Sequence, residues 1–110
     1  MLDKRAKPDH PIHELLVARW SPYAFADRPV AVADLGSLFE AAGWAASSYN
    51  EQPWSYIAAP RDDRQQYDRV LSCLVEGKQA WAKNVPVLGL GIVTHRFKLN
   101  GKENKAAVHD

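Results

Sequence analysis

The chain has 110 residues, of which 46% are hydrophobic and 25% charged, and its formal net charge is +1. This size predicts one domain with a core of its own, and the near-neutral charge argues against partners such as nucleic acid or an anionic membrane. No apolar run approaches the length that spans a bilayer and no signal-peptide pattern opens the chain, so we expect a cytoplasmic protein.

The sequence of the first 19 residues predicts a disordered N-terminus followed by a helix. Residues 1–8 are basic and polar, and we expect them to be disordered. Asp9 or His10 could cap a helix that begins near Pro11 and ends at Arg19. The organised domain should therefore comprise residues 9–110.

Two further helices follow from apolar spacing. Asp34 could cap the first of them, with a buried stripe formed by Leu35, Leu38, Phe39 and Ala42. Asp62 and Gln65 resemble a capping box for the next. Its apolar face would comprise Tyr67, Val70, Leu71 and Leu74, and the single cysteine, Cys73, is expected to be buried beside them.

Two apolar runs predict strands. Residues 54–59 form a short run that ends before Pro60, and residues 87–94 form a nearly continuous one. The second run is typical of a strand covered on both faces, as in an α/β or a three-layer α+β sheet. A polar loop should follow over residues 95–101, and a further helix should begin at Lys102.

A polar segment separates the second predicted helix from the first predicted strand. Ser47 and Ser48 can donate hydrogen bonds through side chain and backbone, while the amides of Asn50 and Gln52 can donate and accept. This set suits a flat heterocycle that alternates carbonyls and ring nitrogens. An ordinary loop that leads through Pro53 into a strand is the alternative interpretation.

This segment and an earlier one together carry a family resemblance. The earlier segment holds Arg19, Ser21 and Phe25, and the later one holds Glu40-Ala41-Ala42, Ser47-Ser48 and Asn50-Glu51-Gln52-Pro53-Trp54. The ordered set resembles the nitroreductase family of flavin mononucleotide (FMN) enzymes. The resemblance implies an α+β, three-layer fold with helices around a mixed sheet, of which residues 9–110 would be the N-terminal part of a single domain.

The resemblance also implies which residues bind the cofactor. Arg19 and Ser21 would bind the FMN phosphate, for which a guanidinium is well suited. The flavin ring would contact Ser47, Ser48 and Asn50, frequently from the partner subunit of a homodimer, with Gln52 as a weaker candidate. One departure is Tyr23, which stands where the family usually has a second basic residue.

The function implied is hydride transfer from NADH or NADPH, through FMN, to a small organic acceptor such as a nitroaromatic or a quinone. The flavin would perform the chemistry, so no catalytic side chain is predicted. The alternative is a truncated, non-catalytic half-domain that binds little flavin and acts in dimerisation or partner binding. Four histidines lack zinc-site spacing, so no metal site is predicted.

Overall fold

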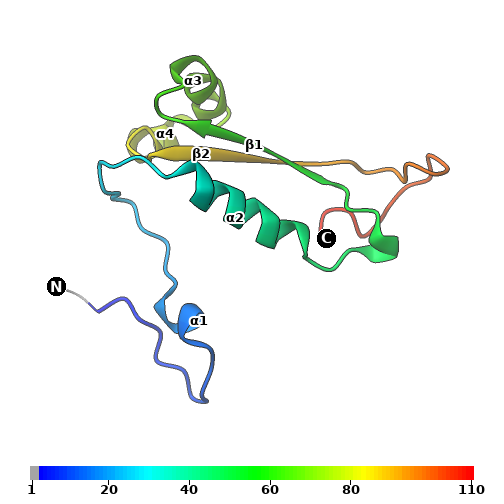
Figure 1. Cartoon of the computed structure of the whole chain (residues 1–110), viewed down its shortest axis with the longest axis horizontal. Coiled ribbons are helices and arrows are strands. Elements are labelled where there is room, and N and C mark those ends of the chain that lie inside the picture. Colours follow the sequence, from blue (N-terminus) through cyan, green and yellow to red (C-terminus); the bar gives the residue numbers. More distant parts are fainter. Residues whose placement is uncertain (1–2) are drawn as a thin grey trace.

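The computed structural model describes residues 3–110, which form helices and two strands in an α+β arrangement (Figure 1). In chain order the elements are α1 (Glu14–Ala18), α2 (Val32–Gly43), the 3₁₀ turn η1 (Ser48–Asn50), β1 (Trp54–Pro60), α3 (Arg64–Ser72), α4 (Glu76–Ala82) and β2 (Val87–Val93). The prediction of disorder for residues 1–8 falls partly on residues 1–2, which lie outside the described residues. Residues 3–8 have neither helix nor strand, and disorder there stays a prediction.

The two strands pair antiparallel, with Trp54 opposite Val93 and Pro60 opposite Val87. Both strand predictions are confirmed to within a residue. Within residues 3–110 this antiparallel pair is the whole sheet. The expectation that β2 is covered on both faces is wrong for the described chain, because Gly89, Gly91 and Ile92 are exposed.

The core lies on one face of this sheet, under α3 and α4. Its buried side chains are Ala59, Tyr67, Val70, Ala82, Val85 and Leu88. The Tyr67 hydroxyl is fully buried and lies 2.7 Å from the Val85 carbonyl and 3.0 Å from that of Ala82. These bonds satisfy the phenol and join α3 to the end of α4, so the predicted apolar face of the third helix is confirmed.

Helix α2 lies on the opposite face of the sheet. Successive strand residues point to opposite faces, and Ile57 packs against the core, so its neighbour Tyr56 must face away from it. The Phe39 ring of α2 lies 5.7 Å from the Tyr56 ring, centroid to centroid. The order of layers is therefore α3 and α4, then the sheet, then α2.

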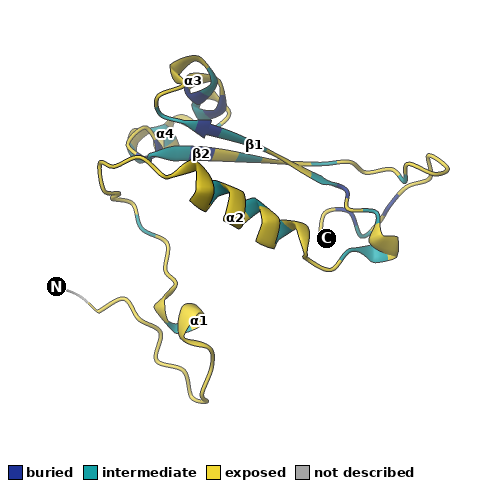
Figure 2. Cartoon of the chain, viewed as in Figure 1, coloured by how far each residue is buried: buried dark blue, intermediate teal, exposed yellow. Residues whose placement is uncertain are grey.

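The predicted buried stripe of α2 is only half covered. Leu35, Phe39 and Ala42 are intermediate in burial, and Leu38 is 60% exposed. Figure 2 shows α2 exposed along most of its length. Two strands about 4.8 Å apart are narrower than a helix with its side chains, so they cannot cover its apolar face.

The N-terminal arm, residues 3–30, leads away from these layers and carries α1 at a distance from them (Figure 1). The helix is shorter than predicted, because His13 rather than Asp9 or His10 caps it, with Nδ1 accepting from the Leu15 amide at 3.2 Å. Glu14 hydrogen bonds to the Arg5 guanidinium and raises the pKa of Arg5.

Aromatic contacts join the arm to the body. The Tyr23 ring meets Trp81 of α4 edge-on with centroids 5.3 Å apart, and Phe25 stacks on the same indole at 6.2 Å. This contact gives Tyr23 a packing role.

Two predicted helix caps are placed differently in the structure. Asp63, not Asp62, caps α3 by accepting from the Gln66 amide at 3.3 Å. Ala31 is the N-cap of α2, and Asp34 lies within its first turn. Local sequence patterns locate these helices but not the residue at which each begins.

Two predictions about the later chain are wrong. Cys73 is exposed, because it lies at the C-terminal cap of α3, beyond the buried face. Residues 102–110 form no helix, because Glu103 pairs with Arg96 in an isolated β-bridge and residues 105–109 form turns. Among residues 3–110, the helices are all too short or too polar to cross a membrane.

The described chain is extended and rich in exposed apolar surface. Its radius of gyration is 17.1 Å, whereas a compact domain of 100 residues has about 13 Å. Its accessible surface is 9116 Å², against about 6,100 Å² for a compact monomer of this mass. The exposed large apolar residues include Leu15, Leu16, Val32, Leu38, Trp44 and Tyr49.

Candidate functional site

The predicted polar segment forms a tight connection, residues 47–52, which we call the polar corner. It joins the end of α2 to the start of β1, and η1 lies within it. The Asn50 amide donates to the Ser47 carbonyl at 2.9 Å, and the Glu51 amide donates to the Ser48 carbonyl at 3.2 Å. The corner therefore folds back on itself and presents its side chains at one end of α2.

The backbone of the polar corner is strained. Tyr49, Asn50 and Gln52 have φ values of 56°, 52° and 49°, in the left-handed region. Residues other than glycine rarely adopt this region, although Asn tolerates it better than Tyr or Gln. Such a conformation costs about 1–3 kcal/mol per residue and is common at functional sites, where surrounding contacts hold it in place.

Two of the predicted donors in the corner are engaged within the protein. The Ser47 hydroxyl donates to Asp110 Oδ2 at 3.0 Å and accepts from the Gln52 amide at 2.9 Å. The Ser48 amide donates to the same Asp110 oxygen at 3.0 Å. Sequence reasoning missed Asp110, because it lies 62 residues beyond Ser48 and belongs to no motif that would single it out.

A hairpin-like segment, residues 95–103, supports the other side of the corner. Glu51 Oε1 accepts from the Lys98 amide at 2.7 Å, and the rings of Tyr49 and Phe97 meet edge-on with centroids 5.8 Å apart. The corner is thus held from both the hairpin and Asp110.

A hollow of about 540 Å³ opens beside the corner, a volume within the usual range for small-molecule sites. Its wall includes Phe39, Glu40, Trp44, Ser47, Asn50 and Gln52. Within residues 3–110, the side-chain amides of Asn50 and Gln52 and the hydroxyl of Ser48 make no hydrogen bond. Free amides beside aromatic side chains fit the edge and face of a flat heterocycle such as a flavin.

Trp44 was not predicted as part of the site. Its indole N–H donates to Glu40 Oε1 at 2.9 Å, and it follows directly after the last residue of α2. An aromatic residue between a helix end and a polar turn was the one signal in the sequence that could have identified it.

Arg19 and Ser21, the predicted phosphate ligands, are close to each other but not to the corner. Arg19 is the C-cap of α1, and its Nη1 lies 3.5 Å from Ser21 Oγ, a long contact. Both residues are exposed, so both can reach a ligand. In Figure 1, α1 lies well apart from the green turn that follows α2, so residues 3–110 of one chain do not bring the two groups together.

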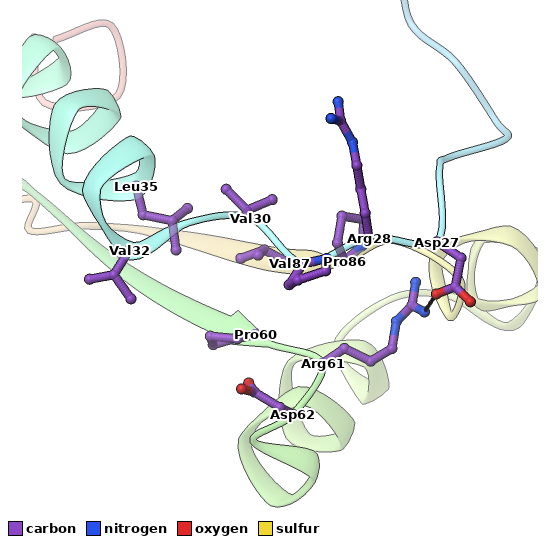
Figure 3. Close-up of a pocket in the computed structure, with 11 residues that line it drawn as sticks. Asp27, Arg28, Val30, Val32, Leu35, Pro60, Arg61, Asp62, Pro86 and Val87 are labelled. Carbon is purple, nitrogen blue, oxygen red and sulfur yellow. Dashed lines mark hydrogen bonds and ion pairs between the residues drawn. The ribbon is translucent and has the colours of Figure 1, made fainter.

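A second hollow, of about 370 Å³, lies between the start of α2 and the ends of the strands (Figure 3). Arg61 Nη1 pairs there with Asp27 Oδ1 at 2.6 Å, while the Arg28 guanidinium points away from the pair. The remaining wall is mainly apolar, with Val30 and Leu35 among its residues. None of the predicted cofactor ligands lines this hollow.

Comparison with known proteins identifies the family. The sequence model of the nitroreductase family matches residues 16–102, which include both groups of predicted ligands. The chain belongs to the nitroreductase family. A solved structure, described as an oxidoreductase containing FMN, matches with a TM-score of 0.87 and 31% identity, over 100% of this chain and 57% of that one. The predicted nitroreductase fold is thereby confirmed.

The nitroreductase family also contains a curated relative of this chain. A Streptomyces coelicolor protein, named as a candidate NADH dehydrogenase/NAD(P)H nitroreductase, is 35% identical over 75 residues. The alignment covers 68% of this chain and 36% of that protein. The chain therefore spans about a third of the relative's length and little more than half of the solved structure.

Proposed function

We propose that the protein is an FMN-dependent oxidoreductase that takes hydride from NADH or NADPH and reduces a small organic acceptor. The observation that carries this proposal is the polar corner, where the side-chain amides of Asn50 and Gln52, which have no partner among residues 3–110, line a hollow of suitable size. The corner lies within the segment that matches the nitroreductase family. The FMN named for the similar solved structure and the NAD(P)H named for the relative support the choice of cofactor and co-substrate.

Two groups of residues in this chain would bind the two ends of the cofactor. Arg19 would bind the phosphate with charge-assisted hydrogen bonds, and Ser21 would add a hydroxyl donor. The side chains of Ser48, Asn50 and Gln52 would bind the polar edge of the ring and orient it. When bound, FMN supplies hydride acceptance and electron transfer, so the protein provides binding and orientation.

We further propose that the working protein is a homodimer with the flavin at the subunit interface. In the described chain α1, which Arg19 caps, lies well apart from the polar corner (Figure 1). A second copy could place its corner beside the first copy's Arg19. The exposed apolar surface of α1 and α2 supports this arrangement, since association would bury it. A cytoplasmic location stays a prediction.

A non-catalytic half-domain is the second candidate. Tyr23, at the position where the family usually has a second basic residue, packs on Trp81 and offers no charge to a phosphate. Without that charge, flavin affinity would be lower unless another cation replaces it.

The two candidates differ in flavin content and kinetics. We expect the purified full-length protein to be yellow, to release about one FMN per subunit on denaturation, and to give parallel initial-rate lines when NAD(P)H and a quinone are varied. A colourless protein that does not bind added FMN would contradict the proposed function and support the half-domain.

A further inference from the structure

We propose that Asp110 is a positioning residue for the polar corner. Its carboxylate would hold Ser47, Ser48 and, through Ser47, the backbone of Gln52 in the conformation that directs the free amides to the hollow. The effect on flavin binding rests on the proposed function, whereas the effect on the loop does not.

A continuous chain of hydrogen bonds leads from Asp110 into the corner. Asp110 Oδ2 accepts from the Ser47 hydroxyl and the Ser48 amide, each at 3.0 Å. The same Ser47 oxygen accepts from the Gln52 amide at 2.9 Å. The Ser47 contact to Asp110 is partly buried, which limits competition from water.

The corner needs such a restraint because of its backbone. Gln52 has φ 49°, and Tyr49 and Asn50 are left-handed as well. Strained residues persist only where their surroundings hold them. The hydrogen bonds that lead from Asp110 hold the left-handed segment at both of its ends, at Ser48 and at Gln52.

The geometry requires an acceptor oxygen but not a negative charge. Both donors bind one oxygen, Oδ2, and an amide oxygen also has two lone pairs. Asparagine at position 110 should therefore preserve the corner, and alanine should not. A role that depended on charge would respond equally to both substitutions.

The test measures FMN affinity by flavin fluorescence quenching in the full-length protein and its variants. We expect Asp110→Ala to weaken binding about tenfold, equivalent to one hydrogen bond of roughly 1.4 kcal/mol, and Asp110→Asn to stay within about threefold of wild type. Ser47→Ala should weaken binding similarly, and the double variant should lose less than the sum of the two. Asp62→Ala removes an exposed carboxylate beyond the other end of β1, away from the corner; it is the matched control and should bind FMN as wild type does.

Hydrogen–deuterium exchange of a peptide over residues 45–54 gives a readout that needs no flavin. Exchange should be faster in Asp110→Ala and restored in Asp110→Asn, with far-UV circular dichroism confirming that each variant is folded. Unchanged exchange in Asp110→Ala would overturn the proposal, as would tighter FMN binding, which would make Asp110 a competitor of the cofactor. Equal loss in both Asp110 variants would also overturn it. If wild type fails to bind FMN, only the proposed function fails, and the exchange data still decide the role of Asp110.

Discussion

We expect Arg19 to provide most of the affinity for the FMN phosphate, because no second cation accompanies it in the segment that resembles the family motif. Tyr23 packs edge-on against Trp81, although 67% of the tyrosine is exposed. The neighbouring Ser21 hydroxyl, 3.5 Å from Arg19 Nη1, can share a ligand with the guanidinium. The phosphate end is therefore expected to depend strongly on a single charge.

Arg19→Ala should weaken FMN binding by about 10- to 100-fold, the loss of a charge-assisted hydrogen bond of roughly 1.5–3 kcal/mol. Riboflavin lacks the phosphate, so its affinity should not change. Titration of both flavins, followed by fluorescence quenching, checks this prediction. Arg28→Ala, which removes another exposed arginine of the same arm, is the control. Equal losses for FMN and riboflavin would mean that Arg19 acts through the fold.

At the scale of elements, the spacing of apolar residues predicts those strands and helix faces whose position depends on burial in the core. The predicted strands over residues 54–59 and 87–94 are observed, and Tyr67 and Val70 point into the core as their spacing indicates. The predicted helix after Lys102 fails for a different reason. Residues 95–103 turn back to contact Glu51 and Tyr49, and the chain beyond them folds toward Ser47, so long-range contacts override local preference.

In the candidate site, too, the local sequence predicts some features, while others depend on contacts between distant residues. The loop chemistry of Ser47, Asn50 and Gln52 placed the polar corner correctly between a helix and a strand. Their use as cofactor ligands stays a prediction. The Ser47–Asp110 bond and the left-handed backbone could not be predicted, because both depend on contacts between distant parts of the chain.

The start of α3 offers a test of one element with a matched pair of residues. Asp63 accepts from the Gln66 amide, whereas neighbouring Asp62 is exposed and makes no hydrogen bond within the described residues. Asp63→Ala should lower the free energy of unfolding by about 1 kcal/mol, and Asp62→Ala should change it by less than about 0.5 kcal/mol. Urea denaturation of the full-length protein measures both. The opposite ranking would restore Asp62 as the cap.

At the scale of the whole molecule, the described chain exposes about 3,000 Å² more surface than a compact monomer of its mass would. An obligate interface buries about 1,000–2,500 Å² on each partner, so association with a second subunit would account for part of this excess. The uncovered face of α2 and the projecting arm contribute to it (Figure 2). Association with a second subunit would bury apolar surface and bring Arg19 near a polar corner at the same time.

The central claim is that these two groups of residues bind one FMN from different subunits. A crystal structure of the full-length protein with FMN tests it most directly. We expect the phosphate within hydrogen-bond distance of Arg19 in one subunit, and the flavin ring in the hollow beside Asn50 and Gln52 of the other. An FMN bound elsewhere, or a dimer in which the corner and Arg19 face away from each other, would contradict the account.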